Sequence, residues 1–216
     1  MRPRILIFSL AAMLAACAQT TTRSVATPAA EEPAQPAWRS IAKPEDATML
    51  DGLDEIWSTG LAFATEHSPA KVKAEGAMIE PGAALDHPAL PPGSYRCRVI
   101  RIGRYADKSG FKSFPPFFCH VKSAGPDQLT FLKQTGTDLP SGWLYPDGDK
   151  RYVFLGAQQD EPGDNSLAYG RDRSRDIAGF VERVGPFEWR LVVPHRDPDG
   201  LDIYALTPVP PNQQPD

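Results

Sequence analysis

From residue 93 onward the chain consists of short runs rich in β-branched and aromatic residues, separated by turn sequences, with no helical pattern between them. Parallel strands need long, usually helical crossovers, so these runs predict antiparallel strands joined by hairpins. The expected strands are residues 94–102, 117–122, 129–134, 142–145, 151–157, 177–184, 187–193 and 201–206. About eight such strands favour a meander β-barrel, with a two-sheet sandwich as the alternative.

A helical segment precedes the strands. Pro44 suits a first helical position, and Glu45 and Asp46 suit the positive end of the helix dipole. Apolar residues then recur every three or four positions to about residue 67, and Trp57 among them is expected to lie in the core.

The fold class predicted from these patterns is α+β and mainly β, with the N-terminal helix packed on the barrel. The helical part covers residues 44–75, including a short second helix at 70–75, and the β-rich part covers residues 93–206. Together they form a single globular domain at residues 38–209, a length that suits one core.

The start of the chain has the pattern of an export signal. Arg2 and Arg4 precede an apolar stretch that ends at residue 16, too short to span a bilayer. Residues 14–17, Leu-Ala-Ala-Cys, resemble a bacterial lipobox, which predicts a signal peptide at 1–16 and a lipid on Cys17. An ordinary cleavage site ahead of Gln19, which would remove Cys17, is the alternative.

The residues after Cys17 predict a tether. Residues 17–37 are rich in Thr, Ala, Pro, Glu and Gln and cannot bury enough apolar surface to order themselves, and the tail at 210–216 is similar. Ala18 replaces the aspartate that marks inner-membrane retention. We therefore expect a periplasm-facing protein of the bacterial cell envelope, anchored in the outer membrane.

The remaining cysteines form an even pair in an oxidising compartment. The two-residue period of a strand places Cys97 on a face with Tyr95 and Val99, and Cys119 on a face with Phe117 and Val121, so two hairpin-paired strands could carry both cysteines on one side. A disulfide between them is expected to stabilise the fold by about 3 kcal/mol.

The charge of the chain argues against a nucleic-acid partner. Loss of residues 1–16, with Arg2 and Arg4, leaves 21 basic and 27 acidic residues, a net charge of −6 compared with −4 for the whole chain. The sequence contains no basic stripe.

An ordered series of short motifs resembles a known family. The motifs are YRCR (95–98), FFC (117–119), LYPD (144–147), YGRD (169–172), RD (175–176), GFVER (179–183), WRLV (189–192) and LDIYAL (201–206). Across roughly residues 38–206 they are similar to the domain-of-unknown-function family DUF4893 of exported proteobacterial proteins, especially those of sphingomonads. The loop at 194–200 is longer than in that family, and the resemblance implies no catalytic residue.

The familiar catalytic and metal motifs are missing from the sequence. It has no G-x-S-x-G, P-loop, G-x-G-x-x-G or H-E-x-x-H pattern, and its histidines lack ligand spacing. His87 with Asp86, or His195 with Asp197, remain possible acid–base pairs. The acidic loops at 160–165 and 197–202 lack the full calcium-binding register, so no metal or cofactor is expected.

The densest group of charges is GRDRSRD at residues 170–176. It is either a solvated loop or a partly buried polar network that could take an anionic group. The candidate residues of such a network are Tyr169, Arg171, Asp172, Arg175 and Asp176.

Two functional classes are compatible with these features. The first, which we favour, is a non-catalytic envelope lipoprotein that binds an apolar small molecule or an envelope protein. The second is a hydrolase or other envelope enzyme with a site dispersed over loops. An open barrel interior of about 300 Å³ or more favours binding, and a histidine within ~3 Å of a carboxylate favours catalysis.

Overall fold

The computed structural model describes residues 36–125, 128–161, 168–196 and 200–213. The signal peptide, Cys17 and nearly all of the tether therefore lie outside the described residues. Within these ranges, no helix has both the length and the apolar composition needed to cross a bilayer.

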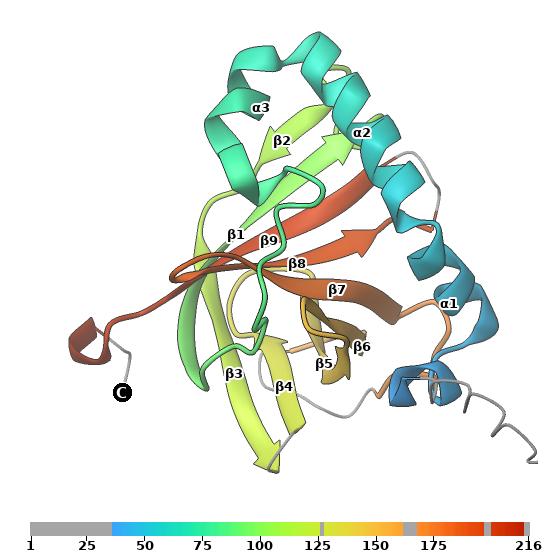
Figure 1. Cartoon of the computed structure of the whole chain (residues 1–216), viewed down its shortest axis with the longest axis vertical. Coiled ribbons are helices and arrows are strands. Elements are labelled where there is room, and N and C mark those ends of the chain that lie inside the picture. The colour runs from blue at the N-terminus through green and yellow to red at the C-terminus, as the bar shows by residue number, and fades with distance from the viewer. Residues whose placement is uncertain (1–35, 126–127, 162–167, 197–199, 214–216) are drawn as a thin grey trace, which may run out of the picture. The chain divides into compact units, whose positions relative to one another are not determined.

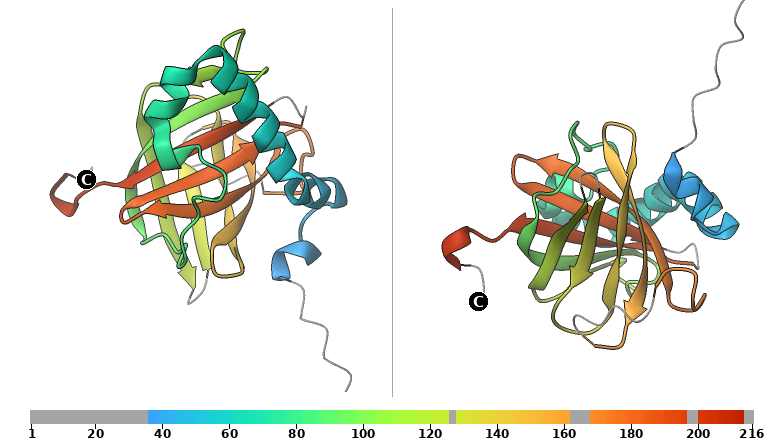
Figure 2. Two further views of the ribbon diagram at one scale, coloured as in Figure 1. Left: turned by 45° about the horizontal axis from the view of Figure 1, so that its top comes forward. Right: turned by 90° about the horizontal axis from the view of Figure 1, so that it is seen from below.

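The strands form a closed antiparallel barrel. The described strands are β1 (Gly93–Gly103), β2 (Phe111–Ser113), β3 (Phe117–Gly125), β4 (Gln128–Lys133), β5 (Leu139–Asp147), β6 (Arg151–Gln159), β7 (Asp176–Gly185), β8 (Glu188–Pro194) and β9 (Gly200–Pro208). From β3 to β9 each strand pairs with the next along the chain, and β1 pairs with β3 on one side. On its other side β1 pairs with β9 from Tyr95 to Gly103, which closes the ring (Figures 1 and 2). The barrel prediction is confirmed and the sandwich alternative is wrong.

One strand was not anticipated. β2 is a short strand that pairs only with the distal half of β1, from Ile100 to Ile102, among the described residues. Its three residues lie between glycine- and proline-containing turns, so the sequence offers too short an alternation to identify it.

The barrel interior is filled through its middle and closed at one end. Large side chains from facing strands pack there, among them Phe131, Phe154 and Trp189. The connection from residues 80 to 92 covers one end, where Leu90 is buried and Pro88 accepts a hydrogen bond from the Trp189 indole at 3.1 Å. Among the described residues, this connection therefore covers that end of the interior.

Two facing glycines permit tight packing between β5 and β6. Gly142 and Gly156 are direct partners, and a Cβ atom on Gly156 would contact the Ser141 carbonyl oxygen and lie 2.5 Å from Cζ of Phe154. Glycine at such positions lets the backbones and the Phe154 ring approach closely.

The helical region is divided into α1 (Pro44–Asp51), α2 (Leu53–His67) and α3 (Pro69–Glu75), with 3-10 turns at Ala37–Ser40 (η1), Gly76–Met78 (η2) and Pro211–Gln213 (η3). The sequence predicted one helix to residue 67, but Gly52 separates α1 from α2. Glycine is conformationally free because it has no side chain, and the Gly52 backbone leaves the helical conformation, with φ −93° and ψ 7°.

Helix α2 covers the outer side of β1, β8 and β9 (Figures 1 and 2). Its buried residues Leu53, Trp57, Gly60 and Ala64 recur at three and four positions and face this sheet. Trp57 is 3% exposed and donates to the Ile79 carbonyl at 3.1 Å, which confirms it as a core residue.

A buried arginine joins the segment after α3 to the barrel. Arg190 of β8 is fully buried, stacks on Trp57 at 4.4 Å and pairs with Glu182 of β7. Its Nη1 atom also donates to the carbonyl oxygens of Ala77, Met78 and Glu80. The side chain therefore supplies the hydrogen bonds that these irregular backbone groups cannot find in a helix.

The predicted disulfide is confirmed. Cys97 of β1 and Cys119 of β3 are both fully buried inside the barrel, with their Cα atoms 6.1 Å apart. Each lies diagonally opposite the other, because Cys97 pairs with Phe117 and Cys119 pairs with Tyr95.

Candidate functional site

The open end of the barrel contains a pocket of about 630 Å³. Its wall is formed by the distal part of β1, the segment before β3, the β4–β5 hairpin and the mouth ends of β6 to β9. A volume in this range accommodates a small-molecule ligand. We call this space the mouth pocket.

An ion-paired cluster lies on one side of the mouth pocket. The Arg101 guanidinium donates to both carboxylate oxygens of Asp202, from Nε at 2.6 Å and from Nη2 at 2.7 Å. His195 places Nε2 at 3.4 Å from the same Asp202 carboxylate. Burial alone would raise the pKa of Asp202, but Arg101 and His195 outweigh it and hold the pKa below its usual range.

Aromatic rings surround this cluster at the rim. Arg101 lies over the rings of Tyr105 and Phe114, at 4.9 and 5.2 Å from their centroids. Tyr105 also stacks against His195, with the two ring centroids 4.1 Å apart. These contacts hold the guanidinium and the imidazole in fixed positions beside the pocket.

Lys133 contributes a second cation from the end of β4. It is 7% exposed, its ammonium donates to the Thr137 carbonyl, and the nitrogen lies 4.2 Å from the centre of the Phe117 ring. Burial lowers the pKa of Lys133. The other lysines of the described residues are exposed.

Beneath these polar groups the pocket wall is apolar. Two positions deeper in β1 and β9, Val99 lies below Arg101 and Tyr204 lies below Asp202. Ile177 at the mouth end of β7 and Val193, the direct partner of Asp202, add apolar surface at the level of the polar groups. The mouth pocket is therefore polar and charged near solvent and apolar inside.

The charged segment at 169–176 forms a different site, outside the barrel. Tyr169 donates to Asp46 of α1 at 2.6 Å, and Arg173 binds both oxygens of Asp46 at 2.6 and 2.9 Å. Asp176 accepts from the Gly170 backbone and lies 3.7 Å from Arg173. Burial would raise the pKa of Asp46, but Arg173 and Tyr169 lower it below its usual value.

Of the five residues predicted for a polar network, the structure brings together Tyr169 and Asp176. It also brings together Arg175 and Asp172, 3.8 Å apart, in a separate exposed group in which Asp172 accepts from Ser174 and Arg175 pairs with Asp160. Arg171 is exposed. The sequence did not identify Arg173 and Asp46, because the alternating arginines do not reveal which one turns toward α1.

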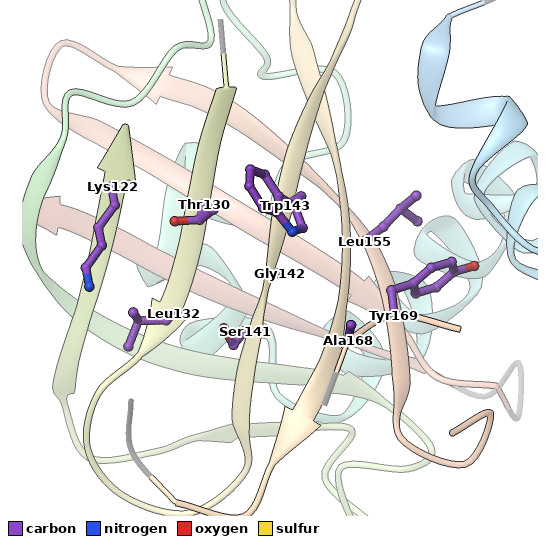
Figure 3. Close-up of a pocket in the computed structure, with 9 residues that line it drawn as sticks. All are labelled: Lys122, Thr130, Leu132, Ser141, Gly142, Trp143, Leu155, Ala168 and Tyr169. Carbon is purple, nitrogen blue, oxygen red and sulfur yellow. The ribbon is translucent and has the colours of Figure 1, made fainter. Parts of the chain in front are cut away.

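A smaller hollow of about 280 Å³ lies on the outer face of the barrel (Figure 3). Lys122 and Tyr169 lie on opposite sides of it, with Trp143 of β5 between them. Trp143 is 42% exposed. Lys122 is the one charged side chain among its lining residues. The hollow therefore lacks the combination of several charged groups and an apolar wall that the mouth pocket has.

The structure describes some residues of the predicted histidine pairs and acidic loops but not others. His195 meets Asp202, whereas Asp197, part of the 197–202 loop and most of the 160–165 loop lie outside the described residues. His87 donates its backbone N–H to the Asp149 carbonyl. Among the described residues, no three His, Cys, Asp or Glu side chains gather as metal ligands.

Strand alternation alone could have indicated Lys133 as a mouth-pocket residue. Lys133 shares the inward face of β4 with Leu129 and Phe131. Arg101 and Asp202 were harder to place, because the opposite faces of β1 and β9 are apolar as well and are covered by α2. The sequence does not state which of two buried faces lines the interior.

Fold and pocket together define a class: a closed meander β-barrel with a helical cover on one side and a ligand-sized pocket at its open end. More particularly, the chain belongs to the family described as Domain of unknown function (DUF4893), whose model matches residues 38–206.

The chain was also compared with curated proteins and with solved structures. No curated protein matches the chain. A solved structure of a redesigned beta barrel is similar at 12% sequence identity and a TM-score of 0.38, covering 55% of this chain and 91% of the designed one.

Proposed function

We propose that this chain is a cell-envelope lipoprotein that binds a small molecule in the mouth pocket without transforming it. The observation that carries the proposal is the pocket itself, about 630 Å³ in volume, with an apolar interior and charged groups at its rim. Binding sites for small molecules have this composition, in which apolar walls supply affinity and a few polar groups orient the ligand.

The envelope part of the proposal is supported by the sequence and by the disulfide. The lipobox-like residues 14–17 and the polar tether fit an anchored protein, and the Cys97–Cys119 bond fits an oxidising compartment. In this proposal the protein faces the periplasm from the outer membrane. Its partners are then the membrane, through the lipid on Cys17, and the bound small molecule.

The anchor is tested by metabolic labelling with a radioactive fatty acid. Wild-type chain is expected to carry the label, and the Cys17→Ser variant is expected to carry none. An unlabelled wild-type chain would contradict the anchor and favour cleavage ahead of Gln19.

Binding is tested by native mass spectrometry of the full chain, extracted gently from its own membrane. We expect a noncovalent molecule that is released on denaturation. The Ile177→Trp variant, which fills the mouth pocket, should lose it, whereas Thr130→Trp in the outer hollow of Figure 3 should retain it. A wild-type chain that is always recovered empty would argue against binding.

An envelope enzyme is a second candidate because His195 lies 3.4 Å from Asp202 at the pocket. Against it, both oxygens of Asp202 already bind Arg101, which is the pattern of a structural ion pair. If the bound molecule is found chemically altered in wild type and unaltered in His195→Gln, the enzyme candidate replaces the binding proposal.

A further inference from the structure

Lys133 is a buried cation without an ion-pair partner. Among the described residues, no carboxylate lies within 4.0 Å of its ammonium nitrogen, whereas the other buried charged side chains, Asp46, Asp176, Arg190 and Asp202, each have an arginine or a carboxylate within that distance. Only one hydrogen bond of the ammonium, to the Thr137 carbonyl, is formed among these residues. An ammonium has three donors, and the Phe117 ring, 4.2 Å from the nitrogen, faces one side of it without cancelling its charge, so donor capacity remains for an anionic partner.

The charges around Lys133 do not compensate it locally. Asp202 attracts the ammonium from beyond 4.0 Å, but both of its oxygens are already bound by Arg101, with His195 beside them. Asp138 faces the ammonium from the hairpin rim but is exposed, so solvent weakens its field. The mouth pocket therefore carries an excess positive charge at Lys133, above its apolar inner wall.

Burial of a charge is costly unless an opposite charge approaches it. Lys133 lines the mouth pocket, so an anionic group on a bound molecule can reach the ammonium. Val99 and Tyr204 lie deeper, with Ile177 and Val193 as further apolar wall nearer the mouth, so an apolar tail would be covered there.

We propose that the mouth pocket selects amphiphiles with a singly charged anionic head group of the carboxylate type. The head group binds the Lys133 ammonium, and the apolar tail extends toward Val99 and Tyr204. This inference rests on the proposed binding function and specifies its ligand class. A single unpaired cation matches a single negative charge.

The test compares three probes that share one tail and differ in head-group charge: octanoate, 1-octanol and octyltrimethylammonium. Their affinities for the purified full-length chain are measured by calorimetric titration. Octanoate is expected to bind at least about ten-fold more tightly than 1-octanol, as a charge-assisted hydrogen bond predicts, and the cation is expected to bind least. Methyl NMR shifts of Val99 and Ile177 report whether each probe occupies the mouth pocket.

Variants assign the preference to one side chain. Lys133→Met should reduce the octanoate-to-octanol ratio to about one while leaving octanol affinity within about three-fold, and Lys133→Arg should keep the preference. Lys133→Gln replaces the Met variant if that variant fails to fold. The matched control is Lys122→Met, at an exposed lysine on the outside of neighbouring β3, which should change nothing.

The outcomes separate this inference from the proposed function. If octanol binds in the pocket as tightly as octanoate, or if Lys133→Met keeps the preference, the inference is overturned and binding stands. If no probe binds and the chain is also recovered empty from its membrane, both fail. Preferential binding of octyltrimethylammonium would reverse the inference, with Asp202 and the rim aromatic rings as the recognising groups.

Discussion

Charged side chains inside this fold serve two different purposes. Arg190 and the Arg101–Asp202 pair are matched with opposite charges and with backbone carbonyl groups, and they connect parts of the structure. Lys133 has one backbone carbonyl, that of Thr137, but no carboxylate within 4.0 Å among the described residues. A buried charge that no structural partner explains is a reason to look for a ligand.

We predict that Asp202→Asn lowers the free energy of unfolding by about 2 kcal/mol near neutral pH, because hydrogen bonds to the charged carboxylate are lost. The folded-state pKa of Asp202 lies below its unfolded value, so its contribution is present above about pH 4 and disappears as the pH falls through the folded-state pKa. Urea unfolding of wild type and variant from pH 7 to pH 3 should show this difference narrowing.

The control for this prediction is Asp51→Asn. Asp51 also binds an arginine, Arg39, but its side chain is 53% exposed. Its loss is expected to cost under about 0.5 kcal/mol, as is usual for a surface ion pair. Equal effects of the two substitutions would show that the mouth cluster does not stabilise the fold beyond an ordinary surface pair.

At the scale of elements, turn chemistry and alternation located all eight expected strands, and proline and apolar spacing located the helices. Three features were not predicted, each for a physical reason. The strand β2 is too short to show a period, and Gly52 interrupts a helix whose apolar pattern continues across it. The inward face of β8 and β9 could not be identified, because both faces are apolar: one packs inside the barrel and the other under α2.

The β5–β6 pair should be sensitive to one added methyl group. We expect Gly156→Ala to lower the free energy of unfolding by about 2 kcal/mol, because the new Cβ would meet the Ser141 carbonyl and the Phe154 ring. Chemical denaturation measures the loss. At Gly52 the nearest atom to a new Cβ is 3.6 Å away, so Gly52→Ala should be neutral or stabilising, and a loss there equal to that at Gly156 would contradict the packing explanation.

The segment after α3 should depend on Arg190. Arg190→Met leaves Glu182 and three carbonyl groups without their donor, so we expect the free energy of unfolding to fall by about 3 kcal/mol. Hydrogen exchange should show the Leu85 amide, which donates to Arg183, losing protection more than the amides of β4.

Arg98→Met provides the comparison for that substitution. Arg98 holds Glu75 of α3 with a bidentate ion pair, but its side chain is 34% exposed. We expect Arg98→Met to lower the free energy of unfolding by about 1 kcal/mol and to leave the Leu85 amide protected from hydrogen exchange. Unchanged exchange at Leu85 in Arg190→Met would mean that Arg190 does not fix this segment.

At the scale of the whole molecule, the barrel could be predicted but the site could not. The sequence directed attention to Tyr169 and its neighbours, where charges are dense along the chain, but these residues fasten α1 to the barrel wall. The mouth pocket instead collects Arg101, Lys133 and Asp202 from strands far apart in sequence. Strand alternation indicates that Lys133 faces inward, but closure of the ring decides which residues it meets, and no local pattern records that.

The disulfide encloses the chain segment that forms part of the rim of the mouth pocket. It joins β1 to β3 across 22 residues, and the enclosed segment carries Arg101, Tyr105 and Phe114 of the pocket rim. Closing a loop of this length should stabilise the fold by about 3 kcal/mol, mainly by restricting the unfolded chain. Urea unfolding with and without reductant should show that loss in wild type, whereas a Cys97→Ala/Cys119→Ala variant should not respond to reductant. Equal stability of oxidised and reduced wild type would mean that strand pairing alone holds the rim segment, because the bridge would then add nothing to the closed ring.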